Sequence, residues 1–118
     1  MAKIASRSAP VPHPLPDRLV DLIASRFRVL AEPMRIKLLD RLRDGPATVR
    51  DLTSATGSSQ QNVSQHLGVL LSAAIVSRRK EGNFAVYSIV DEGVFELCEQ
   101  VCGGLRREIG EVASLLEP

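Results

Sequence analysis

The stretch ATVRDLTSATGSSQQNVSQHLGVLLSAAIV, residues 47–76, decides the fold. Thr48 opens a capping-box pattern with an acid three residues later, and Gly57 supplies a helix stop. Ser58 opens a second capping-box pattern, with a glutamine three residues later, ahead of a longer helix. Almost no linker separates the two helices, so they must meet at a sharp angle. The stretch therefore predicts a helix-turn-helix. The buried stripe of the second helix is expected to be Val63, Leu67, Leu70 and Leu71.

The first two turns of this second helix are almost entirely polar and carry no Lys, Arg, Asp or Glu. Base edges in the major groove are read by hydrogen-bonding side chains such as Gln, Asn and Ser, and the N-terminal turns of a recognition helix usually reach them. A merely solvated helix start would usually carry Lys and Glu. His66 has two open roles, a bond to phosphate or a tie to a neighbouring helix. Asn62 is a weaker candidate, since its position also lets it face the following hairpin. The expected DNA contacts are Ser59, Gln60, Gln61, Asn62, Ser64, Gln65 and His66.

After the second helix the pattern changes to β-strand. Val76 leads into a polar strand, Glu81-Gly82-Asn83 makes a turn, and Phe84–Ile89 returns as a β-rich run. Basic residues flank the tip of this hairpin, where they would follow phosphates or the minor groove. The alternative is a solvated turn with no ligand. The candidate contacts here are Arg78, Arg79, Lys80 and Asn83.

Three further helices are expected around this unit. One begins at Asp17, the next begins at Pro33 and stops at Gly45-Pro46, and the last begins with Asp91 as N-cap. Residues 1–16 carry four prolines and no amphipathic period, which predicts a flexible arm. The folded domain is therefore expected to span residues 17–118, mainly α-helical, with five helices and one small hairpin.

Composition supports a DNA-binding protein and argues against other classes. Aromatic residues make up only 3% of the 118 residues, so the core must be aliphatic, which favours helices packed on helices. Residues 1–90 carry 13 Lys and Arg against 7 Asp and Glu, whereas residues 91–118 carry 2 against 7. A basic body suggests a polyanionic partner. No apolar run is long enough to span a membrane and no signal-peptide core is present, so a cytoplasmic location is expected. No catalytic constellation appears, so we expect no enzyme.

The order of these pieces resembles the ArsR/SmtB family of bacterial winged-helix repressors. The resemblance covers about residues 25–95 and rests on LAEPMRIKLLDRL at 30–42, on Ser64-x-His66-Leu67-x-x-Leu70, and on EGNFAVYSI at 81–89. It implies a homodimer formed by the first and last helices, which binds a palindromic operator, represses transcription and leaves DNA when an inducer binds. Ala74 departs from the family, which commonly has Gly there. A winged helix used for protein–protein contacts remains the alternative function.

The inducer is the open question, because the metal sites familiar in the family are missing. The third helix has no Cys or His, and the last helix has Gly93, Gly104 and Arg107 where further ligands would be. The two cysteines, Cys98 and Cys102, lie one helical turn apart on the last helix. One reading makes them small apolar residues packed in a dimer interface, which the sequence favours. The other makes them thiols that bind As(III), Cd(II) or Zn(II), or respond to oxidants.

Overall fold

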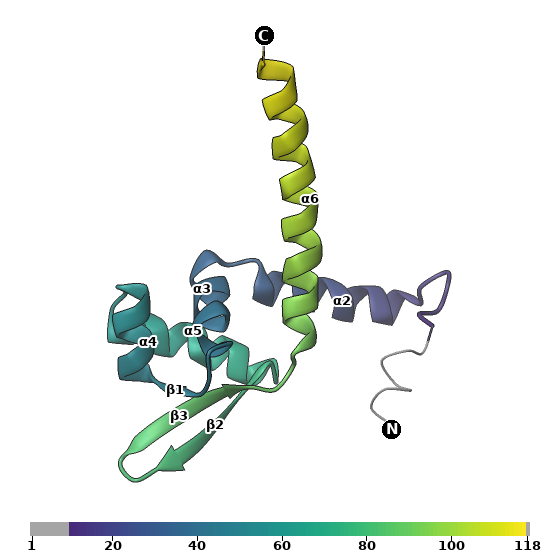
Figure 1. Ribbon diagram of the computed structural model, residues 1–118. Coiled ribbons are helices and arrows are strands. Elements are labelled where there is room, and N and C mark those ends of the chain that lie inside the picture. Colours follow the sequence, from purple (N-terminus) through teal and green to yellow (C-terminus); the bar gives the residue numbers. More distant parts are fainter. Residues whose placement is uncertain (1–9, 118) are drawn as a thin grey trace.

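The computed structural model describes residues 10–117. Within this range the chain forms five helices and a three-stranded antiparallel sheet, as Figure 1 shows. The winged helix-turn-helix fold expected from the sequence is thereby confirmed. In chain order the elements are α2 (Asp17–Leu30), α3 (Pro33–Leu42), β1 (Ala47–Thr48), α4 (Val49–Thr56), α5 (Gln60–Ser72), β2 (Val76–Glu81), β3 (Phe84–Ile89) and α6 (Gly93–Leu116).

The core lies where α3, α4 and α5 meet. Leu38 of α3, Leu52 of α4 and Leu67 of α5 are fully buried, and Val63 anchors the first turns of α5 beside them. Apolar residues therefore occupy one face of each helix, which leaves the opposite face of α5 free for solvent or a ligand. Gly57 ends α4 in the left-handed conformation, with φ of 71°, so the chain reverses into α5 within a few residues.

Hydrogen bonds at the helix starts fix the helix-turn-helix locally. Thr48 Oγ1 accepts from the Asp51 N–H, and the Asp51 carboxylate accepts from the Thr48 N–H, each at 3.1 Å. This confirms the expected capping box. At α5 a single cap bond stands in place of the expected box: Ser59 is the N-cap, and its Oγ accepts from the Asn62 N–H at 3.1 Å. The prediction of Ser58 as the cap was therefore wrong.

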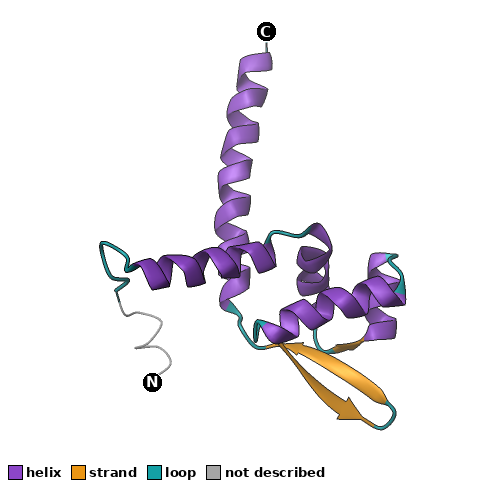
Figure 2. Cartoon of the chain, turned by 180° about the vertical axis from the view of Figure 1, so that it is seen from behind, coloured by secondary structure: helices purple, strands orange, loops and turns teal. Residues whose placement is uncertain are grey.

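The sheet has the strand order β1-β3-β2. Residues 76–81 and 84–89 pair as the expected hairpin, with Val76 opposite Ile89 and Glu81 opposite Phe84. The two-residue strand β1 was not expected from the sequence. It pairs Ala47 with Tyr87 and so joins the base of the hairpin to the start of α4. Figures 1 and 2 show the hairpin extending below the helices as a wing.

Helix α5 ends in a Schellman motif that contains an alanine where glycine is usual. The Ile75 N–H donates to the Leu70 carbonyl at 3.1 Å, and the Ala74 N–H donates to the Leu71 carbonyl at 3.0 Å. Ala74 has φ of 59°, a left-handed conformation that L-residues adopt at a cost. The chain therefore keeps the turn that Gly would favour at this position.

Helices α2 and α6 project from this body and are mostly exposed. Figure 1 shows α6 rising away from the wing, with α2 crossing near its base. Asp91 was expected as the N-cap of α6, but the helix begins two residues later, and Asp91 Oδ1 accepts from the Gly93 N–H at 3.0 Å. Arg26 of α2 pairs with Asp91 at 3.3 Å. At the other side, Arg43 pairs with Glu99 at 3.7 Å, and its Cζ lies 4.7 Å from the centre of the Phe95 ring.

The remaining described residues add no further element. Residues 10–16 form neither helix nor strand and are exposed, while the rest of the expected arm, including Lys3 and Arg7, lies outside the described residues. Among the helices of residues 10–117, none combines the length and the hydropathy needed to cross a membrane.

Candidate nucleic-acid interface

The exposed face at the start of α5 is polar and uncharged. Gln60, Gln61, Ser64 and Gln65 are all exposed there, while Val63 between them is fully buried. One apolar anchor thus fixes the helix, and its outward side chains carry amide and hydroxyl groups that donate and accept hydrogen bonds. Such groups match the donor and acceptor pattern of base edges.

Asn62 and His66 of the expected contact residues also form side-chain hydrogen bonds inside the protein. The Asn62 amide Nδ2 donates to Ser58 Oγ at 2.7 Å, which holds the side chain against the turn before α5. His66 Nδ1 lies 3.1 Å from Arg35 Nη1 of α3. Because a guanidinium can only donate, Nδ1 is the acceptor and the ring hydrogen is on Nε2. The structure therefore places His66 as a tie to the neighbouring helix, with its Nε2–H as the remaining donor.

Arg35 itself joins three helices. Its Nε donates to the Val29 carbonyl at 2.6 Å and its Nη2 to the Arg28 carbonyl at 3.5 Å, both near the C-terminus of α2. With the bond to His66 it therefore links α2, α3 and α5 through one planar guanidinium, whose donors form a rigid fork. No sequence pattern pointed to this link, because Arg35 and His66 are 31 residues apart.

The wing carries its basic residues on β2. Arg78, Arg79 and Lys80 are exposed. Arg79 pairs with Glu81, through Nε at 2.6 Å, and donates from Nη1 to Ser88 Oγ at 3.2 Å. Arg78 and Lys80 form no ion pair among residues 10–117. The wing turn has its positive φ of 60° at Gly82, the first central residue, which suits a type II′ turn.

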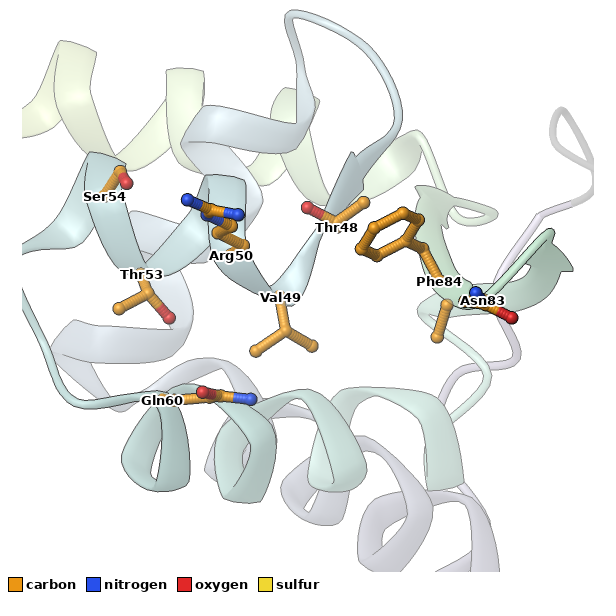
Figure 3. Close-up of a pocket in the computed structure, with 9 residues that line it drawn as sticks. Thr48, Val49, Arg50, Thr53, Ser54, Gln60, Asn83 and Phe84 are labelled. Atoms are coloured by element: carbon orange, nitrogen blue, oxygen red, sulfur yellow. The ribbon is translucent and has the colours of Figure 1, made fainter.

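A cleft joins the recognition helix to the wing. Its volume is about 470 Å³, and it contains two of the expected contact residues, Gln60 at the start of α5 and Asn83 at the wing turn. Figure 3 shows Gln60 on one side of the space and Asn83 on the wing beyond it. The structure therefore brings one candidate residue of α5 and one of the wing to the same cleft.

Helix α4 contributes side chains to this cleft that the sequence analysis did not select. Arg50, Thr53 and Ser54 line it from α4, and Phe84 lines it from β3. A signal was available, since the first helix of a helix-turn-helix crosses the DNA backbone. Arg50 follows two residues after the Thr48 cap, at the end of α4 nearest the wing.

The electrostatics of the α4 start are also defined. The Thr48 N–H donates to the Asp51 carboxylate, and this bond, followed by the Thr48 hydroxyl, holds the pKa of Asp51 below its ordinary value. Arg41 and Arg50 lower it further. Asp51 is thus kept ionised by the cap that orders the helix.

The two cysteines lie on α6, well away from the wing. Both are exposed in the single chain, and Arg106 Nη2 lies 3.6 Å from Cys102 Sγ. No group of three or more His, Cys, Asp or Glu that could hold a metal gathers within residues 10–117. Zinc in a closed site takes four ligands, so a single chain does not fit that ion. The two thiols suit a soft metal ion that binds with a low coordination number.

Exposed apolar residues mark α6 and α2 as a surface that needs a partner. A heptad pattern of alternating three- and four-residue steps runs along α6 and contains both cysteines. Most of its later members are more than half exposed, up to 79% for Leu116. On α2, Leu22 and Phe27 are also more than half exposed. The seam of α6 consists of Phe95, Cys98, Cys102, Leu105, Ile109, Val112 and Leu116.

The fold and this surface define a DNA-binding domain, and comparison with known proteins identifies the family. A helix-turn-helix domain family matches residues 30–79. The HTH-type transcriptional regulator Rv0081 of Mycobacterium tuberculosis is 36% identical over 100 residues, which cover 84% of this chain and 88% of that protein. Its crystal structure superposes with a TM-score of 0.74 at 34% identity, covering 83% of this chain and 99% of that one.

Two further relatives are informative. The homodimeric winged helix-turn-helix DNA-binding domain of Mb0332 from Mycobacterium bovis, described as a possible ArsR-family regulator, has a TM-score of 0.70 at 29% identity and covers 85% of this chain and 95% of its own. A Streptomyces lividans protein named "Probable mercury resistance operon repressor" is 36% identical over 94 residues, which cover 80% of this chain and 70% of that protein. The chain belongs to the ArsR/SmtB family of transcriptional regulators.

Proposed function

We propose that this regulator is a repressor that binds a palindromic operator as a homodimer, with α5 in the major groove. The observation that carries the proposal is the exposed, uncharged polar face of Gln60, Gln61, Ser64 and Gln65, whose first residue, Gln60, lines a cleft shared with the wing. Short amide and hydroxyl groups at the N-terminal turns of α5 supply direct readout. Arg78 and Lys80 of the wing supply phosphate contacts. Because operator binding takes place on the chromosome, the proposal includes a cytoplasmic location.

The homodimer is supported by the uncovered apolar residues of α2 and α6. A seam with apolar residues at heptad steps buries itself against a second helix, and a second copy of α6 carries the same apolar seam. The homodimeric M. bovis domain supports this assembly. A two-fold axis then places two α5 helices on two half-sites, so the operator is a palindrome.

The inducer acts at Cys98 and Cys102. Exposure in the single chain and a position on the α6 seam support this part of the proposal, since an ion bound there would alter the pairing of the two subunits. The name of the S. lividans relative points to a thiophilic ion. As(III), Cd(II) and Zn(II) are the candidate inducers, Zn(II) requiring ligands from both subunits, and a peroxide is the candidate oxidant.

The DNA-binding proposal is tested by selecting duplexes from a random-sequence pool and then measuring affinity against salt. We expect one palindromic sequence to be enriched and its binding constant to fall steeply with salt, with a slope set by the phosphates contacted. A winged helix that docks proteins would enrich no sequence and would contradict the proposal. The dimer is tested separately by sedimentation, where a monomer at operator-binding concentrations would contradict it.

The inducer proposal is tested on the operator complex of the reduced protein. The complex is titrated with As(III), Cd(II), Zn(II), Hg(II) and hydrogen peroxide, and the Cys98→Ala/Cys102→Ala variant is titrated in parallel. We expect one ligand to release the wild-type protein and not the variant. If every ligand releases the wild-type protein and the variant alike, the cysteines are packing residues and the inducer proposal is contradicted. Ser114→Ala, on the same helix, is the matched control.

A further inference from the structure

The cleft between α4 and the wing has the side chains of a phosphate site. Arg50 is its only charged lining residue, and no carboxylate lines it. Arg50 is exposed and forms no ion pair in the described part of the chain. Its guanidinium is therefore available to an anion, for which its fork of donors is well matched.

One hydroxyl group of the cleft also lacks a partner. Thr53 Oγ1 is buried and has no hydrogen-bond partner, the only such side-chain atom among residues 10–117. A buried hydroxyl without a partner costs free energy, which a ligand oxygen would recover. Figure 3 shows Val49 and Thr53 directed from α4 toward the side where Gln60 lies, with Arg50 and Ser54 on the same helix. Thr53 thus lies on the side of α4 that faces Gln60, and Arg50 and Ser54 line the same cleft.

Phe84 closes the wing side of the cleft. Its side chain is 59% exposed and lies between two hollows, this cleft and a second one lined by Arg78, Arg79 and Lys80. Figure 3 shows its ring beside Thr48, at the start of α4. An exposed aromatic ring next to phosphate donors offers an apolar face to a sugar.

The position of the cleft indicates which ligand fits. One sugar-phosphate strand of a duplex separates the major groove from the neighbouring minor groove. When a helix occupies the major groove and a wing lies at that minor groove, this strand passes between the helix and the wing. The cleft lies between α4 and the wing, and Gln60 of α5 is one of its lining residues. We propose that it seats this strand segment, with Arg50 and Thr53 on one phosphate and Phe84 on the adjoining deoxyribose. This inference rests on the proposed DNA-binding function.

The test measures binding of the full chain to its selected operator and to a random duplex, across a salt series. Arg50→Ala is expected to weaken both duplexes about tenfold, the loss of a charge-assisted hydrogen bond, and to lower the salt slope by about 0.9 for each subunit. Arg50→Lys should keep most of the slope. Phe84→Ala should weaken both duplexes, whereas Phe84→Leu should retain binding. Because Arg50 and Phe84 are exposed, circular dichroism is expected to show these variants folded.

Arg107→Ala is the matched control, since it removes one exposed arginine from α6. It should leave affinity and salt slope unchanged. If Arg50→Ala behaves like Arg107→Ala while the wild-type protein binds its operator, the cleft does not seat the strand and the proposed function stands. If the wild-type protein binds no operator, the proposed function itself fails. Ethylation interference would place the contact: ethylation of one backbone phosphate per half-site should weaken binding of the wild-type protein and should not weaken binding of Arg50→Ala further.

Discussion

Replacing Ala74 by glycine should stabilise the protein, because this residue holds a left-handed turn. Its φ is 59°, and the turn is fixed by two hydrogen bonds of a Schellman motif that end α5 ahead of the buried Ile75. An L-residue in this conformation costs about 1–2 kcal/mol, whereas glycine adopts it freely. Glycine gains about 0.4–1 kcal/mol of entropy in the unfolded chain, which opposes the gain. Ala74→Gly should therefore add about 0.5–1 kcal/mol to the free energy of unfolding.

The assay is urea unfolding followed by circular dichroism at one protein concentration, with the melting temperature as a second measure. We expect the melting temperature to rise by about 2–6 °C, given the size of the domain. The matched control is Ala73→Gly, one residue earlier. Ala73 has φ of −86°, which suits an L-residue, so glycine there should cost about 0.5–1 kcal/mol. If Ala74→Gly were no more stable than the wild-type protein, the claim that Ala74 adopts a costly left-handed conformation would be refuted.

Three further predictions concern the helix starts and the tie between α3 and α5. Ser59→Ala should lower the free energy of unfolding by about 1 kcal/mol through loss of the α5 cap, whereas Ser58→Ala should cost less, as urea titrations will show. The bonds from Thr48 keep the pKa of Asp51 low in the folded state. The ionised carboxylate therefore stabilises the folded protein above the ordinary pKa of Asp, and this contribution is lost as pH falls through the pKa of Asp51 in the folded state. The difference in unfolding free energy between wild type and Asp51→Ala should therefore be constant from about pH 7 to pH 5 and shrink below about pH 4. His66→Ala should cost about 1 kcal/mol or more of stability, because it leaves Arg35 Nη1 without its partner, and unchanged stability would contradict the assigned tie.

Patterns within one element made most of the fold predictable. The apolar stripe of α5, the stop at Gly57 and the β-rich run at Phe84–Ile89 are local signals, and each corresponds to an observed feature. The capping residue of α5 was not determined in this way. Two serines stand in succession, each followed three residues later by a polar residue, and only the backbone conformation selects Ser59, with φ of −71° and ψ of 153°.

Features that depend on tertiary contacts were beyond the sequence. Strand β1 has two residues, too few for a period, and exists because Ala47 meets Tyr87 across 40 residues of chain. The cleft combines α4, α5 and the wing, so the part played by Arg50 was hidden although its position in the first helix was a hint. The polar residues at the start of α5 lie on an exposed face, as their composition predicted, and their role as base contacts stays a prediction.

The central claim is that α5 reads base sequence, and base-by-base affinity measurements test it most directly. The selected operator is varied at each position, and each variant is titrated with wild-type protein, Gln61→Ala and Ser72→Ala, an exposed control at the other end of α5. We predict that Gln61→Ala relaxes the preference at one position in each half-site, by about 1–3 kcal/mol, and leaves the other positions as they were. Ser72→Ala should change none. A loss in Gln61→Ala that is uniform over all positions, or no loss at all, would contradict the account.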